Sequence, residues 1–69
     1  MKLSARNRIP ATVTAITAGE ATANIELDAC GSRLVASITV EAARELGLTP
    51  GSEVMAIIKA SDVMLAVAD

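Results

Sequence analysis

The chain has 69 residues, a formal net charge of −2 and no aromatic residue, although 52% of its residues are apolar. A domain this short buries only about 60% of its unfolded surface, so disulfides, metals or further copies of the chain usually support such small cores. With one cysteine, Cys30, and no histidine, an internal disulfide is excluded and a zinc cluster is not expected. The apolar surplus therefore predicts a homo-oligomer.

Charge and composition also argue against broad classes of function. Proteins that bind single-stranded nucleic acid use a basic groove with aromatic stacking platforms, and this acidic, aromatic-free chain offers neither. No apolar run approaches the roughly 20 residues of a membrane span, and the first residues do not resemble a signal peptide. Together with the lone cysteine, these features predict a cytoplasmic protein without nucleic-acid or membrane partners.

Three segments have the residue pattern of half-buried strands. Apolar and polar residues alternate over 11–17, 21–28 and 34–39, which is the period of a strand with one buried face. Pro10 biases the preceding residue toward extended backbone, so we expect the first strand to start near it. Turns at 18–20 and 29–32 join the three strands. Cys30 lies in the second turn without a base nearby in the sequence, so we interpret it as a small turn residue rather than a nucleophile.

One short helix and two apolar strands follow. Thr39 can cap a helix over about 40–46, Glu41 suits its first turn, and Gly47 ends it. A turn at 49–52 then leads into the predicted strands 53–59 and 63–68. Five short strands with a helix between the third and the fourth are typical of a mainly β, partly closed barrel of the oligonucleotide/oligosaccharide-binding (OB) kind. We expect residues 1–69 to form this one domain.

Two polar segments lie at opposite ends of the sequence, Ser4-Ala5-Arg6-Asn7 and Lys59-Ala60-Ser61. Together they supply two positive charges, two hydroxyls, a side-chain amide and backbone N–H groups, which are the donors that a small oxyanion with two charges requires. Neither segment contains a histidine, a cysteine or a base within reach of a nucleophile, so the pattern predicts binding without catalysis.

The same segments resemble a known family. Ser4–Asn7, then Glu45–Leu48 with Pro50–Glu53, and finally Ile58–Met64 are similar to motifs of the molbindins. Molbindins are small cytoplasmic molybdate-binding proteins, and they share their fold with the domain appended to molybdate-transport ATPases and to molybdate-sensing regulators. The resemblance covers essentially the whole chain. It implies a hexamer, built as a trimer of dimers, that binds molybdate or tungstate at subunit interfaces.

The resemblance also implies which residues bind the anion. The principal interface site would take side chains from one subunit and the Lys59 turn of another, with Ala60 contributing its backbone amide; the residues are Ser4, Arg6, Asn7, Lys59, Ala60 and Ser61. A second kind of site in the family lies near a threefold axis and would draw here on Gly19, Glu20, Ala21 and Thr22. This chain departs from the family there, because Thr22 replaces an asparagine and Glu20 adds a negative charge that could repel a dianion.

A site that contains only donors suits a fully deprotonated dianion. Hydrogen phosphate would bring an O–H that finds no acceptor, and such an unpaired group costs about 1–3 kcal/mol. Sulfate has the right charge but is smaller than molybdate. Molybdate and tungstate are nearly alike in size and charge, so the pattern does not separate them. Asp62 must point away from the anion for this interpretation to hold.

Two alternatives compete with storage, buffering or homeostasis of intracellular molybdenum. Residues 37–51 also resemble the swapped-hairpin DNA-binding domain of transition-state regulators. That function needs a basic face, whereas the region 32–52 balances Arg33 and Arg44 against Glu41 and Glu45. The second alternative is a structural oligomer that binds no ligand.

Overall fold

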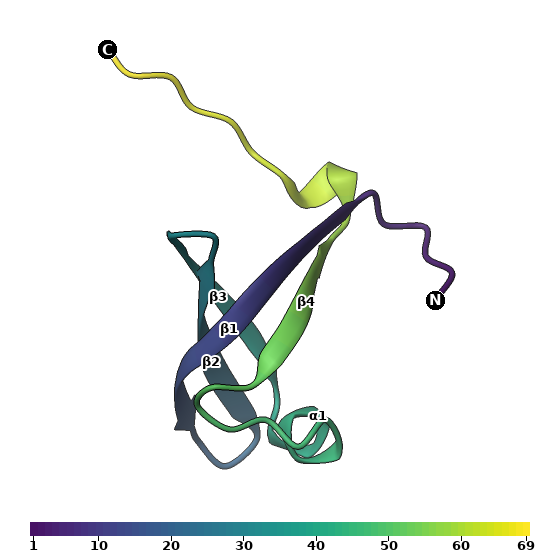
Figure 1. Ribbon diagram of the computed structural model, residues 1–69, viewed down its shortest axis with the longest axis vertical. Helices are drawn as coiled ribbons and strands as arrows, with labels where there is room; N and C mark the ends of the chain where they lie inside the picture. Colours follow the sequence, from purple (N-terminus) through teal and green to yellow (C-terminus); the bar gives the residue numbers. More distant parts are fainter.

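Four antiparallel strands form one curved sheet in the order β3-β2-β1-β4 in the computed structural model, which describes residues 1–69. The elements are β1 (Asn7–Ala18), β2 (Thr22–Ala29), β3 (Ser32–Thr39), α1 (Val40–Glu45), β4 (Glu53–Ile58) and a 3-10 turn at Ala60–Asp62. Helix α1 lies at one end of the sheet, and the N- and C-terminal segments leave it at the other end (Figure 1). The mainly β class and the place of the helix between β3 and β4 agree with the sequence-based prediction.

Short turns join the first three strands, as predicted. Between β1 and β2, the amide of Gly19 donates to the carbonyl of Thr22 at 2.8 Å. Between β2 and β3, the two-residue turn Cys30-Gly31 has φ values of 55° and 92°, and paired positive φ angles match the twist of a tight hairpin. Asp28 Oδ1 accepts a hydrogen bond from the amide of Gly31 at 2.8 Å. Cys30 is therefore an exposed turn residue.

Strand β1 begins earlier than predicted, at Asn7 rather than near Pro10. Its first half, from Asn7 to Thr12, pairs with β4, and it pairs with β2 only from Thr12 onward. Pro10 thus has a partner strand on one side only. A proline is tolerated there because its missing N–H leaves no gap between two strands.

A bulge at Thr14 explains why the alternation in the sequence blurs near the end of β1. The register between β1 and β2 shifts between Val13 and Ala15, and the Thr14 hydroxyl donates to the carbonyl of Glu26 at 3.1 Å. A bulge places one extra residue on its strand and changes which side chains face inward. Ala15 and Ile16 are accordingly both half-buried.

Helix α1 has the caps that the sequence predicts. The Thr39 hydroxyl accepts from the amide of Ala42 at 3.0 Å. At the other end Gly47 has a φ of 65°, its amide donates to Arg44 O, and the amide of Leu48 donates to Ala43 O. This pair of bonds is the Schellman arrangement, which a glycine with positive φ makes possible.

The buried core is small and comes from two strands. Its six residues all lie on β1 and β2, and half-buried residues from β3, α1 and β4 pack against them; the six are Ala11, Val13, Ala23, Ile25, Leu27 and Ala29. No helix is long and apolar enough to cross a membrane.

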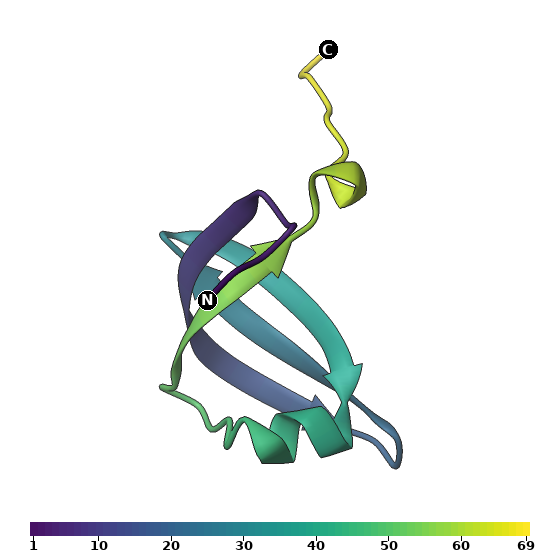
Figure 2. The same cartoon turned by 90° about the vertical axis from the view of Figure 1, so that its right-hand side faces the viewer.

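The fifth predicted strand and the closure of the barrel are the main differences from the prediction. Residues 63–69 form no strand and are exposed, and β3 and β4 remain the two edges of an open sheet. In Figures 1 and 2 this C-terminal segment runs away from the rest of the molecule. The local pattern gives 63–68 its tendency to form a strand, but within one chain it has no neighbour to pair with.

Candidate functional site

The fold brings the two polar segments of the sequence to the same end of the sheet. In the ladder between β1 and β4, Asn7 lies opposite Ile58, and Asn7 Nδ2 donates to the carbonyl of Ile58 at 3.1 Å. Asn7 is half-buried and ties the start of β1 to the end of β4. Asn7 and Ile58 are thus hydrogen-bonded to each other. Ser4 and Arg6 lie shortly before Asn7 in the chain, and Lys59 and Ser61 lie shortly after Ile58.

The N-terminal segment forms a hollow of about 220 Å³ of its own. It is lined by Met1, Leu3, Ala5, Arg6 and Arg8. The only charged side chains in that lining are two guanidinium groups, and the exposed Arg6 and Ser4 form no hydrogen bond within the chain. These donors are free to bind an external acceptor.

The Lys59–Ser61 segment forms the start of the 3-10 turn. The amide of Asp62 donates to Lys59 O at 2.9 Å, and the amide of Val63 donates to Ala60 O at 3.3 Å. Lys59 and Ser61 are exposed, and their side chains have no partner in the chain. Asp62 forms no ion pair with Lys59; the one ion pair of the molecule joins Arg33 to Glu26. The Lys59 ammonium is therefore not neutralised by the neighbouring carboxylate.

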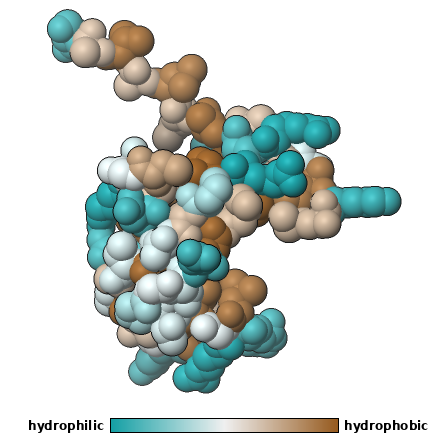
Figure 3. All heavy atoms as spheres, viewed as in Figure 1, coloured by the Kyte–Doolittle hydropathy of each residue, from teal (hydrophilic) through white to brown (hydrophobic).

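Charge is unevenly distributed over the molecule. Four of the six cations are Lys2, Arg6, Arg8 and Lys59, which lie in or directly beside the two polar segments. Asp62 is the only acidic residue next to these segments in the sequence. Hydrophilic side chains accordingly gather beside the N-terminal segment (Figure 3, upper right). A chain with a net charge of −2 thus has a cationic end, and such a local field attracts anions.

The second predicted site has the opposite electrostatic character. Glu20 and Ala21 line a hollow of about 480 Å³ together with residues of α1. The charged groups there are the carboxylates of Glu20, Glu41 and Glu45 and the guanidinium of Arg44. Gly19 and Thr22 close the turn below. Three negative charges against one positive charge make this hollow a weaker candidate for a dianion.

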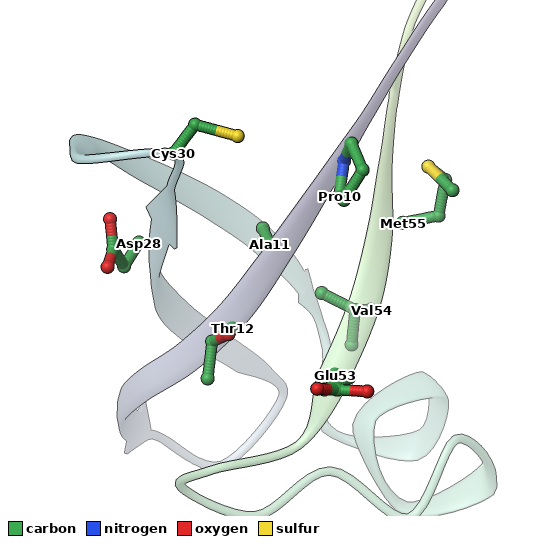
Figure 4. Close-up of a pocket in the computed structure, with 8 residues that line it drawn as sticks. All are labelled: Pro10, Ala11, Thr12, Asp28, Cys30, Glu53, Val54 and Met55. Carbon is green, nitrogen blue, oxygen red and sulfur yellow. The ribbon is translucent and has the colours of Figure 1, made fainter.

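One hollow, of about 610 Å³, was not identified from the sequence (Figure 4). Thr12 pairs with Asp28 on one side and with Glu53 on the other, so two carboxylates flank β1 on one face. Strand alternation places all three residues on the polar face, but only the register reveals that they are neighbours. The lining contains no cation, and the chain holds no group of three or more metal-ligating side chains. This hollow fits neither a dianion nor a metal ion.

Comparisons with known proteins identify the family. The model of the TOBE domain matches residues 3–65. The solved structure of a molybdate-binding protein from Sporomusa ovata superposes with a TM-score of 0.92 at 40% identity, covering 97% of this chain and 100% of that one. The fold of that small protein is therefore the fold of this chain.

Two curated relatives extend the comparison. The molybdenum-pterin-binding protein MopA of Rhodobacter capsulatus is 51% identical over 67 residues; the match covers 96% of this chain but only 25% of MopA. A probable molybdenum-pterin-binding protein of Haemophilus influenzae is 40% identical over 68 residues, with 97% and 99% of the two chains covered. The predicted resemblance is thereby confirmed: the chain belongs to the TOBE domain family, and within it to the small molbindin-like proteins.

Proposed function

We propose that this chain binds molybdate at the interfaces of a homo-oligomer. Tungstate has the same charge and nearly the same size, so we propose that it binds there too. It would store or buffer molybdenum in the cytoplasm and catalyse no reaction. The relatives named for molybdate or molybdenum-pterin binding support the class of ligand. The number of subunits, a hexamer built as a trimer of dimers, is what the resemblance to molbindins implies.

One observation carries the proposal: the cationic end is assembled by a hydrogen bond. Asn7 Nδ2 holds the carbonyl of Ile58 at 3.1 Å, and this places Arg6 and Lys59 at the same end of the sheet. Neither cation has a carboxylate partner. Two unneutralised cations next to free hydroxyl groups match the charge and the acceptor oxygens of a tetrahedral dianion.

A second chain is needed to enclose the anion. Ser4, Arg6, Lys59 and Ser61 are all exposed, and exposed ion pairs contribute little because water screens them. No hydrogen bond of this chain joins the N-terminal segment to the Lys59 turn beyond that of Asn7. Desolvation by a neighbouring subunit would strengthen each charge-assisted hydrogen bond. An interface site therefore explains better than a site in one chain how an anion would be held.

Selectivity follows from a set of partners that all donate to the anion. Backbone amides, a guanidinium, an ammonium and hydroxyls that turn their protons toward the ligand satisfy every oxygen of molybdate. The O–H of hydrogen phosphate would force one of these hydroxyls to accept instead of donate, so one phosphate oxygen would lose its donor, which costs about 1–3 kcal/mol, or roughly tenfold or more in affinity. Sulfate is smaller, so donors held at the spacing that suits molybdate would stand too far from its oxygens.

Titration calorimetry with molybdate tests the site. Arg6→Ala and Lys59→Ala each remove a charge-assisted hydrogen bond, worth about 1.5–3 kcal/mol, so each variant should bind molybdate at least tenfold more weakly. Arg44→Ala is the matched control, because it removes one cation from α1, at the other end of the sheet. We expect its affinity to stay within about twofold of the wild type, since distant exposed charges are screened.

Wild-type affinity for molybdate in all three variants would contradict the proposed site. A loss of the same size in all three variants would indicate a general effect of net charge instead of a local site. Adding DNA at low salt tests the DNA-binding alternative. The Arg33–Glu26 ion pair disfavours this alternative, because it neutralises one of the two cations in the region 32–52.

A further inference from the structure

Arg8 is a cation at the open end of the sheet that the proposed site does not use. Its side chain is exposed and forms neither an ion pair nor a hydrogen bond within the chain. Together with Arg6 it lines the hollow of about 220 Å³ beside the N-terminal segment, and no carboxylate lines that hollow. Arg8 therefore adds an unneutralised charge next to a residue of the proposed site.

The strand register places Arg8 on the same face of the sheet as Arg6 and Lys59. Arg8 lies opposite Ile57 in the ladder between β1 and β4, so the same register, continued by two residues, sets Arg6 opposite Lys59. Lys59 has extended backbone, with φ −64° and ψ 137°, so the alternation of the strand continues through it. Opposite residues share a face, as do residues two apart on one strand.

The burial of the intervening residues agrees with this arrangement. Asn7 and Ile58 are half-buried, so the two strands turn these side chains toward the core at the point where they lie side by side (Figure 1). The residues on either side of this pair are exposed, namely Arg6, Arg8, Ile57 and Lys59. The outer face therefore has four neighbouring positions here, three of them cationic and one apolar.

These three cations are close enough to act on one anion, and no carboxylate opposes them. Opposite residues have Cβ atoms about 5 Å apart, and residues two apart on a strand are separated by about 7 Å. Both distances are shorter than the screening length of about 8 Å at physiological salt. The first carboxylate further along this face is that of Glu53, opposite Thr12, which is about 13 Å from Arg8 along β1. Asp62 forms no ion pair with any of the three cations.

We propose that Arg8 is a third cation of the oxyanion site, which attracts the dianion through its charge and makes no hydrogen bond to it. This inference rests on the proposed binding of molybdate, and it extends that site to a residue outside the two polar segments. Because Arg8 lies one position further along the strand than Arg6 on this face, its attraction acts across water and depends on salt. The Coulomb energy is proportional to the charge of the ligand, so a third cation favours a dianion over a monoanion. Arg8 is thus a residue that determines specificity for the charge of the anion.

Calorimetric titration with molybdate at two salt concentrations tests this role. In about 10 mM sodium chloride, where charges act over about 30 Å, Arg8→Gln should bind molybdate about fivefold more weakly than the wild type. In about 1 M sodium chloride the screening length falls to about 3 Å, and the two affinities should agree within about twofold. Arg8→Lys keeps the charge but loses the planar fork of donors, so its affinity should stay within about twofold of the wild type at both salt concentrations.

Arg44→Gln is the matched control, because it removes the same charge from α1 at the other end of the sheet. A loss in Arg8→Gln that is no larger than the loss in Arg44→Gln would overturn the proposal. A loss that persists in 1 M salt, or that Arg8→Lys does not restore, would also overturn it, because either result would mean that the guanidinium binds the anion directly.

Thermal unfolding without any oxyanion tests the arrangement of the three cations by itself. Like charges at neighbouring positions of one face repel each other, so in low salt Arg8→Gln should raise the melting temperature by about 1–4 °C at equal chain concentration. Arg44→Gln should not raise it, and the gain in Arg8→Gln should disappear in 1 M salt. An unchanged or lower melting temperature in Arg8→Gln would contradict the shared cationic face. A wild type that binds no molybdate would instead refute the proposed function, and with it the role of Arg8 in binding, whereas the gain in melting temperature would remain.

Discussion

The two ends of the sheet are built in contrasting ways. At the end with α1, the chain satisfies its own backbone: Thr39 caps the helix, the Gly47 turn ends it, and the amide of Val40 donates to Ala21 O. At the other end, the N-terminal segment and the Lys59 turn are exposed, and their cations have no carboxylate partner. The self-contained end is acidic and the open end is cationic. One end of the molecule thus satisfies its own polar groups, whereas the other leaves its cations exposed and without ion-pair partners.

The largest effect on stability should come from the core that supports both ends. Ile25 is one of the two largest fully buried side chains, so Ile25→Ala should lower the free energy of unfolding by about 3 kcal/mol through lost burial and a cavity. Chemical denaturation followed by circular dichroism measures it. Leu3→Ala, at an exposed leucine outside the sheet, should change stability by less than about 1 kcal/mol. Equal losses in both variants would mean that the core is elsewhere.

Asn7 should link stability to ligand binding. Asn7→Ala removes the hydrogen bond to Ile58 O and should cost about 1 kcal/mol of stability. It should also weaken molybdate binding severalfold, because the start of β1, directly after Arg6, loses its side-chain hydrogen bond to the end of β4. Asn24→Ala, at an exposed asparagine of β2 without a side-chain hydrogen bond, should leave the affinity unchanged. Unchanged molybdate affinity in Asn7→Ala would mean that the Asn7–Ile58 hydrogen bond does not contribute to anion binding.

Thr39 should affect stability alone. Thr39→Ala removes the N-cap of α1 and should cost about 1 kcal/mol, whereas Thr39→Ser keeps the hydroxyl and should restore most of it. Thermal unfolding of both variants gives the difference. Molybdate affinity should be the same in both, because α1 lies at the end of the sheet opposite to the proposed site. A change in affinity would mean that the two ends are coupled.

The smallest effect should come from the Arg33–Glu26 ion pair. Its side chains are 70% and 36% exposed, and exposed pairs contribute about 0–1 kcal/mol. A double-mutant cycle with Arg33→Ala and Glu26→Ala should therefore give a coupling energy below about 1 kcal/mol. A larger coupling would place this pair in a buried interface of the assembly.

The sequence predicts the self-contained part of the fold well. Hairpin turns, helix caps and half-buried strands depend on residues close together in the chain, so the pattern around Gly31, Thr39 and Gly47 is sufficient. The extension of β1 to Asn7 was missed, because it depends on pairing with Ile58 of β4, 51 residues later. The segment 63–68 has the pattern of a strand, but its place depends on a neighbour that one sequence does not specify.

For the candidate site, the sequence predicted the residues but not the contacts between them. Its two polar segments are recognisable in the sequence by their donor groups, and the resemblance to molbindins implies which of their residues form one interface site. No pattern within the sequence could reveal that Asn7 binds the carbonyl of Ile58. The acidic row Asp28–Thr12–Glu53 was missed for the same reason, since it is created by the register of three strands. In each case the missing information is a pairing between distant segments.

Native mass spectrometry of the unmodified chain, titrated with molybdate and in parallel with sulfate, measures assembly and anion binding in one experiment. We expect an assembly with an even number of chains that gains discrete molybdate masses and none from sulfate. An assembly that gains neither anion would contradict the proposed binding of molybdate at the cationic end. A monomer that gains neither would contradict the proposed interface site.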